Sequence, residues 1–221
     1  MRCPEFIRLS VVALDNYLNY IDGYVTGQLR LLVMSKNQQA PDDLELVRTF
    51  VNTRDIEQGT EALSTPAALG NWLSGAGLPS GQVRPTAGDL RNALELREAL
   101  RAILLSHGDG SPEPADAWRT LDEAARRARL HVRFGTEGAA LLESAADGVD
   151  GALGRLVAII HAGVADENRW RRLKACRLHT CEWAFYDHTK NRSGAWCNMD
   201  VCGNRAKARA YRERRAQGAG A

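Results

Sequence analysis

The chain has few of the features that mark secreted, membrane-spanning or uniformly basic proteins. It has only five cysteines in 221 residues, and aromatic residues make up 6% of it. No uninterrupted apolar run approaches the roughly eighteen residues that a membrane span needs. Asp15, Asn16, Asn19 and Asp22 interrupt the N-terminal stretch that could otherwise serve as a secretory signal. We therefore expect a cytoplasmic protein with no membrane partner.

The sequence also lacks the common catalytic motifs. It contains no G-x-S-x-G, no P-loop, no G-x-G-x-x-G and no H-E-x-x-H. The sequence therefore predicts a protein that is not an enzyme.

The charge is nearly balanced overall but unevenly distributed. The chain carries a net charge of +2, whereas residues 169–215 hold thirteen Lys or Arg and four acidic residues. This segment therefore carries +9 and the remainder −7. A basic C-terminal segment on an acidic body indicates a local surface for an anionic partner.

Apolar spacing predicts helices over most of the middle of the chain. Thr65-Pro66 is typical of a helix start, and Thr86 with Asp89 resembles a capping box that opens the clearest helix. Residues 130–134 alternate as a short strand that could pair with residues 139–143. The expected fold is mainly α with a small β-hairpin: a helical N-terminal domain, then a small four-cysteine module that ends in a basic helix.

We divide the chain by composition into four segments. Residues 1–40 form an extension of uncertain status, in which Met34 is an alternative start that would leave residues 1–33 outside the native protein. The other three segments are a helical domain at 41–166, a zinc module at 169–215 and a disordered tail at 216–221.

Four cysteines carry the clearest chemistry. Cys176, Cys181, Cys197 and Cys202 form two C-x4-C pairs separated by fifteen residues. Two close pairs joined by a short loop are typical of a closed, structural zinc site, although an iron–sulfur cluster also accepts four thiolates. The even, paired spacing favours one structural Zn²⁺. His179 could replace one cysteine, but four thiolates already complete the coordination sphere.

Five aromatic residues surround this pattern: Trp170, Trp183, Phe185, Tyr186 and Trp196. We expect them to form the small core around the metal, because aromatic side chains supply most of the burial available to a small domain. The alternative is that Trp183, Phe185 or Trp196 stacks on bases of single-stranded nucleic acid.

A basic helix is expected after Cys202. Gly203 could take the positive φ needed to leave the metal knuckle, and Asn204 could cap the helix. Arg205, Arg209 and Arg212 then share one stripe, with Lys207 on the other side. This stripe is a candidate surface for phosphates or base edges, and the alternative is a solvated charged tail.

The cysteines and their neighbours resemble the CGNR zinc finger family. The match includes Cys181-Glu-Trp, Trp196-Cys197-Asn and Cys202-Gly203-Asn204-Arg205-Ala-Lys207, and it covers about residues 169–214. The resemblance implies that the four cysteines bind zinc and that the module binds DNA. It also implies a role for Asn204, Arg205 and Lys207, which match the signature after the last cysteine.

The preceding helices resemble the ABATE domain, the usual N-terminal partner of that zinc finger. The resemblance rests on residues 50–54, on Leu63-Ser64-Thr65-Pro66 and on Arg97-Glu98-Ala99-Leu100-Arg101. It implies a regulator of transcription in the stress response.

Three functional hypotheses follow. The first is a DNA-binding transcriptional regulator, and the second is a binder of RNA or single strands. The third is a small-molecule-binding protein in which the zinc module is only a structural cap; Asn52, Thr53 and Arg54 could line the effector pocket or could equally cap a helix. By analogy with regulators that read palindromes, a homodimer is also expected.

Overall fold

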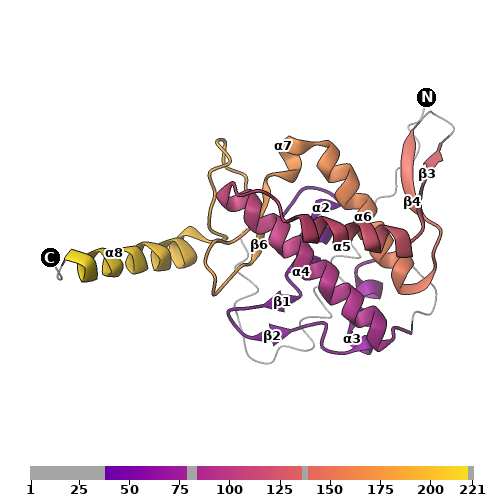
Figure 1. Ribbon diagram of the computed structural model, residues 1–221, viewed down its shortest axis with the longest axis horizontal. Coiled ribbons are helices and arrows are strands. Elements are labelled where there is room, and N and C mark those ends of the chain that lie inside the picture. Colours follow the sequence, from indigo (N-terminus) through magenta and orange to yellow (C-terminus); the bar gives the residue numbers. More distant parts are fainter. Residues whose placement is uncertain (1–37, 79–83, 136–138, 219–221) are drawn as a thin grey trace.

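The computed structural model describes residues 38–78, 84–135 and 139–218. Most of the extension at 1–40 therefore lies outside the described residues. The predicted fold class is confirmed, because the described chain is mainly helical with small antiparallel hairpins (Figure 1). The elements are α2 Leu44–Val51, β1 Arg54–Asp55, β2 Thr60–Glu61, α3 Pro66–Gly75, α4 Ala87–Asp109, α5 Ala115–Arg127, β3 Leu130–Phe134, β4 Ala140–Ser144, α6 Gly148–Ala165, α7 Glu167–Trp170, β5 Leu173–Ala175, β6 Ala184–Tyr186 and α8 Asn204–Gly218.

Helix α4 is the centre of the fold, and α2, α3, α5 and α6 pack against it. Its start is the capping box predicted from the sequence: Asp89 N donates to Thr86 Oγ1 and Thr86 N donates to Asp89 Oδ2. One face of α4 is fully buried through Leu96, Leu100 and Ile103. The helical domain is thus organised around one long, well-capped helix (Figure 1).

Helix α6 is the one described helix that is long and apolar enough to cross a membrane, judged by length and composition only. Many of its apolar side chains are instead buried in the core of the protein. Leu153, Leu156 and Ile160 are buried in the same core cluster as α2 and α4. We therefore describe α6 as a core helix.

The predicted hairpin forms between β3 and β4 and projects from the helical body. Val132 pairs with Leu142, and residues 136–138, between the two strands in sequence, lie outside the described part. Val132, Phe134 and Leu141 are exposed on it.

The short strands β5 and β6 join the C-terminal module to the helical core. Leu173, Ala175, Ala184 and Tyr186 belong to the main hydrophobic cluster, and β5 packs directly on α4. The segment boundary near residues 166–169 therefore separates two patterns of sequence, but the main hydrophobic core continues across it, and a smaller cluster surrounds the cysteines. Helix α8 extends away from the body and continues to Gly218, three residues into the segment expected to be a tail (Figure 1).

Candidate metal centre and basic helix

The first cysteine pair lies at the end of the β5–β6 hairpin. Cys176 follows β5 directly, and its backbone N–H donates to Trp183 O at 3.0 Å, which extends the strand pairing by one residue. Cys181 closes the intervening turn, since its N–H donates to Leu178 O at 2.7 Å. Strand pairing and a tight turn therefore bring these two thiols together.

The loop that leads to the second pair is held by a buried ion pair. Lys174 Nζ lies 2.8 Å from Asp187 Oδ2 and also donates to the carbonyls of Arg192 and Gly194. Asp187 accepts further hydrogen bonds from Thr189 and from Gly194 N. Both side chains are at most 4% exposed. Sequence analysis missed this pair, because Lys174 lies inside a strand and Asp187 is thirteen residues away.

Burial alone would raise the pKa of Asp187. The hydrogen bonds from Lys174, Thr189 and Gly194 outweigh that effect and lower the pKa to about 2. Asp187 is therefore ionised at neutral pH and anchors the loop as a carboxylate. Gly194 is required next to it, because a Cβ there would lie 2.8 Å from Asp187 Cγ.

The second cysteine pair ends in a π-helical turn, Met199–Gly203. Asn198 caps this turn: its Oδ1 accepts from Asp200 N at 2.8 Å and from Val201 N at 3.0 Å. The expected cap at Asn204 is wrong, because Asn204 Nδ2 donates back to Asp200 O and α8 continues directly from the turn.

The role expected of Gly203 also needs correction. It lies in the right-handed π-helical turn and does not take a positive φ. A Cβ at this position would lie 2.5 Å from Met199 Sδ and 3.2 Å from Trp196 Cδ1. A side chain at this position would therefore displace the flexible Met199 side chain and press on Trp196, and no positive φ is involved.

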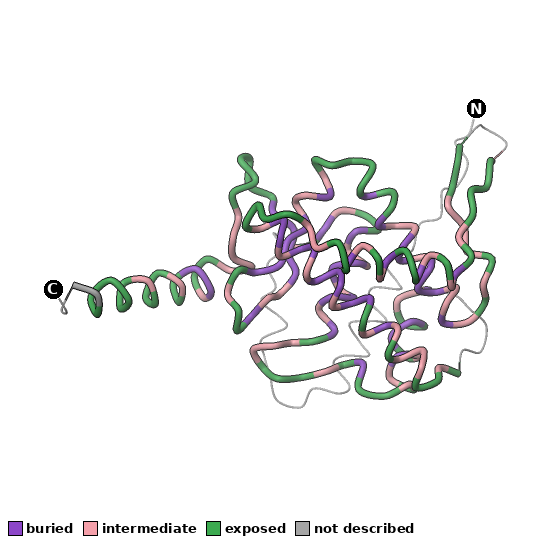
Figure 2. Tube along the Cα trace, viewed as in Figure 1, coloured by how far each residue is buried: buried purple, intermediate pink, exposed green. Residues whose placement is uncertain are grey.

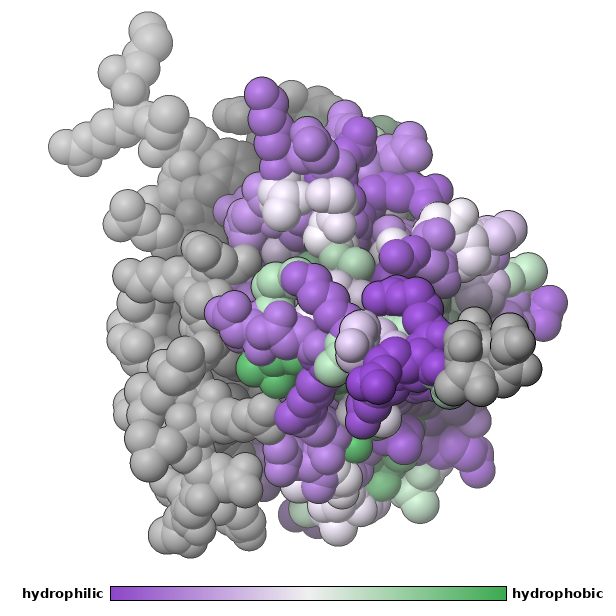
Figure 3. Space-filling view, turned by 90° about the vertical axis from the view of Figure 1, so that its left-hand side faces the viewer, coloured by the Kyte–Doolittle hydropathy of each residue, from purple (hydrophilic) through white to green (hydrophobic). Residues whose placement is uncertain are grey.

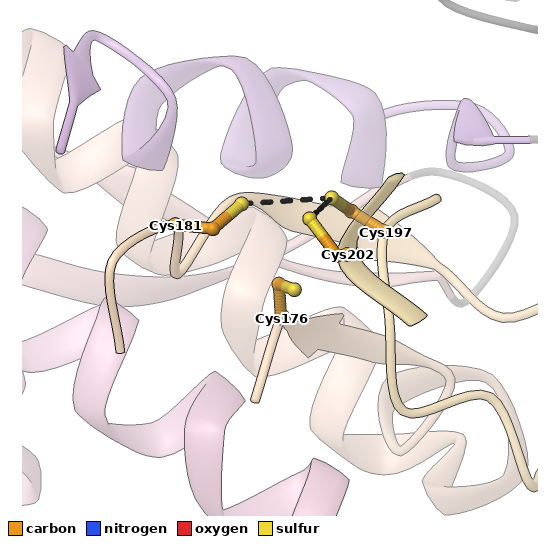
Figure 4. A group of neighbouring side chains, drawn as sticks. All are labelled: Cys176, Cys181, Cys197 and Cys202. Atoms are coloured by element: carbon orange, nitrogen blue, oxygen red, sulfur yellow. Dashed lines mark hydrogen bonds between the residues drawn. The ribbon is translucent and has the colours of Figure 1, made fainter. Parts of the chain in front are cut away.

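The four sulfur atoms converge on one point (Figure 4). All four Sγ atoms lie within 4.8 Å of one another, with 3.6 Å between Cys181 and Cys197 and 3.7 Å between Cys197 and Cys202. A tetrahedron with zinc–sulfur distances near 2.3 Å has edges of about 3.8 Å. The donor set therefore fits one tetrahedral Zn²⁺. His179 is exposed and is not a member of the cluster.

The electrostatics of the thiols favour a cation at this point. Hydrogen bonds from Cys181 and Cys197 lower the pKa of Cys176, and the same hydrogen bonds to Cys176 raise the pKa of Cys181 and Cys197. A single thiolate thus opposes the formation of further thiolates beside it. A divalent cation removes that opposition, because it attracts all four sulfur charges.

The expectation that the five aromatic residues form the core around the metal holds only in part, because Trp170 and Tyr186 belong to the main hydrophobic cluster of the helical domain. Trp170, Phe185 and Tyr186 are at least 93% buried, so Phe185 offers no face for base stacking. Trp183 and Trp196 are partly buried and pack against the cysteine cluster.

The polar cluster at the end of α2 fastens the helical domain to the zinc module. The Asn52 side chain bonds to both N and O of Ala184. Thr53 is buried, donates to Phe50 O and accepts from Arg97. Arg54 is exposed and lies 3.7 Å from Glu98. The effector site predicted for these three residues stays a prediction.

Buried groups of α4 add two further links. Arg101 Nη1 donates to Glu182 O at 2.9 Å, one residue beyond Cys181. His107 Nδ1 contacts Leu173 O at 2.8 Å. The zinc module is therefore held by polar bonds as well as by the shared core.

Helix α8 presents a dense positive charge to solvent. Six Lys or Arg stand against the single acid Glu213, and Asn204, Arg205, Lys207, Arg209 and Arg212 are all exposed. Arg205 forms an ion pair with Glu57 of the body, and Arg209 Nε lies 2.8 Å from Glu213 Oε1. The described surface at this end of the molecule is largely hydrophilic (Figure 3).

Comparison with protein families supports both resemblances. Residues 172–215 match the CGNR zinc finger, and residues 44–178 match the ABATE model, described as "Putative stress-induced transcription regulator". A search of the curated proteins found no match. With the finger and the sulfur geometry together, the four cysteines form a site for one structural zinc ion.

Proposed function

The chain belongs to the ABATE family and ends in a CGNR zinc finger, and from this premise we propose that it is a DNA-binding regulator of transcription. Both domains indicate a regulatory role rather than a catalytic one. A cytoplasmic location and a part in the stress response are included in the proposal.

One observation supports it most directly. The zinc-supported turn at 199–203 continues without a break into α8, so the metal fixes the base of a helix that extends into solvent (Figures 1 and 2). Arg205, Arg209 and Arg212 lie on one stripe of that helix. The four thiolates and Zn²⁺ together contribute −2, which leaves about +7 on residues 169–215.

Zinc's chemical role here is structural, because four thiolates leave no open position for water or substrate. The residues of the chain do the binding. Guanidinium groups on an exposed helix can contact two phosphate oxygens at once and can also reach guanine edges in the major groove.

The test is selection of sites from random duplexes with zinc-loaded protein, followed by titration at several salt concentrations. We expect enrichment of a motif and a loss of affinity as salt rises. Replacing Arg205, Arg209 and Arg212 with alanine should lower the slope of log K against log salt by about 2 to 3, since each phosphate contact contributes about 0.9. Normal binding by the triple variant, or binding unchanged up to about 200 mM salt, contradicts the proposal.

Competition with single-stranded RNA distinguishes the alternative hypothesis. Preference for RNA over the duplex would support it. The small-molecule effector and the homodimer remain predictions; thermal shift with metabolite pools and sedimentation equilibrium test them in turn.

A further inference from the structure

A small groove lies between the zinc knuckle and the base of α8. Its volume is about 250 Å³. Arg177 and His179 line it from the turn between Cys176 and Cys181, and Ala206, Arg209 and Glu213 line it from α8. Trp196, which packs against the cysteine cluster, also lines it, together with the apolar side chains of Leu178 and Ala210.

The chemistry of the groove favours an anion. An arginine lines it from each of the two elements, Arg177 from the turn and Arg209 from α8, and Glu213 is the one acidic side chain among the lining residues. The short side chain of Ala206 leaves room for a ligand to approach the helix. Arg177 and Arg209 are both exposed, so an anion can reach them without a rearrangement of the protein.

The size of the groove limits the ligand. Pockets that enclose small organic molecules measure about 300 to 1,000 Å³, and this groove is smaller than that range and open to solvent. It is suited to one group of a longer molecule that passes along the surface.

The groove is continuous with the arginine stripe. At 100° per residue, Arg209 lies between the stripe formed with Arg205 and Arg212 and the face formed by Ala206 and Glu213. A strand that contacts the stripe can therefore place its next phosphate in the groove without leaving the protein surface.

We propose that this groove seats one backbone phosphate of a DNA strand between Arg177 and Arg209, with Glu213 as a built-in competitor. The inference rests on the proposed function and adds Arg177, which the sequence analysis did not identify. Glu213 accepts a hydrogen bond from Arg209 at 2.8 Å and so occupies the group that the phosphate must bind.

Two substitutions with matched controls test it by fluorescence anisotropy on the full-length, zinc-loaded protein with the selected duplex. Arg177→Gln removes a contact, and we expect about a tenfold higher Kd and a salt slope lower by about 1. The control Arg119→Gln removes an exposed arginine of α5 and should change neither.

Glu213→Gln releases Arg209, and we expect about two- to fivefold tighter binding. Its control is Asp122→Asn, because Asp122 and Arg126 form an exposed i,i+4 pair on α5 much like Glu213 and Arg209. Each of these two variants removes one negative charge, so an effect of net charge alone would change the two affinities equally. Tighter binding cannot arise from a variant that has failed to fold.

The outcomes separate this inference from the proposed function. If the wild type binds the duplex but Arg177→Gln behaves as Arg119→Gln does, the groove is not a phosphate site and the proposed function stands. Equal gains for Glu213→Gln and Asp122→Asn show a general charge effect and also overturn the inference. Absence of duplex binding by the wild type overturns both proposals, and an Arg177→Gln effect confined to single-stranded RNA assigns the groove to that ligand instead.

Discussion

The side chain of Asn52, at the end of α2, pairs with the backbone of Ala184 through two hydrogen bonds of 2.7 and 2.9 Å. Ala184 begins β6, the strand that follows Cys181, and it is completely buried. An amide side chain therefore acts as an extra strand partner and joins the helical domain to the metal module over a separation of 132 residues.

Replacing Asn52 should test this link. Asn52→Ala leaves a buried N–H and a buried C=O without partners, so we expect the free energy of unfolding to fall by about 2–3 kcal/mol in urea titrations. Asn168→Ala is the control, because Asn168 makes an exposed hydrogen bond to Arg192 and should cost less than about 0.5 kcal/mol. Unchanged stability with lost response to a small molecule would instead support the effector site predicted at Asn52, Thr53 and Arg54.

The four-cysteine site predicts the zinc content of the protein and its thermal stability. Elemental analysis should find one zinc per chain, and Cys202→Ala should lose it, because a buried ligand at the base of α8 is removed. The thermal transition should then fall sharply, since zinc binding and folding of such modules are coupled. Cys3→Ala is the control, because Cys3 stands outside the two C-x4-C pairs. Full zinc content in Cys202→Ala would contradict the four-thiolate site.

The low pKa of Asp187 predicts that the free energy of unfolding falls in acid. Its pKa is about 2 in the folded protein against an ordinary value of 3.8, so the stabilisation is fully present above pH 4. It is lost as the pH falls from about 4 to 2, and it amounts to about 2 kcal/mol. Denaturant titrations of wild type and Asp187→Asn along that pH range should show their difference shrinking toward acid. A constant difference between the two proteins would argue against an ionised Asp187.

A side chain at Gly194 should clash within the loop that Asp187 anchors. A Cβ at Gly194 would meet the Asp187 carboxyl group at 2.8 Å, so Gly194→Ala should destabilise the protein by about 1–3 kcal/mol. It should also weaken zinc retention against a chelator, because the loop carries Cys197. Gly88→Ala in the first turn of α4 is the matched control: its nearest neighbour lies at 3.5 Å, and alanine favours the helix. Equal effects of the two changes would show that the loop tolerates displacement.

Local signals in the sequence were sufficient for much of the fold. The capping box at Thr86 and Asp89, the Thr65-Pro66 helix start and the β3–β4 hairpin are each encoded within a few residues, and all are confirmed. The cysteine quartet was also readable, because metal ligands impose a spacing that few other requirements produce.

Long-range polar contacts were not readable in the same way. The bonds of Asn52 to Ala184, of Lys174 to Asp187 and of Arg101 to Glu182 join residues that no periodicity relates. The roles expected of Gly203 and Asn204 were wrong for a similar reason. Both were interpreted from residue preference, whereas the chain forms a π-helical turn that is capped by Asn198 and continues directly into α8.

The insertion of β5 and β6 into the helical core bears on how this protein could be engineered. A fragment cut near residue 169 would leave Leu173, Ala175 and Tyr186 facing water, and the remaining helices would lose the strand that covers α4. The zinc finger is therefore not expected to fold well when it is fused to another protein without its helical domain. Any event that loosens the helical body should therefore also loosen the four-cysteine site that β5 and β6 support.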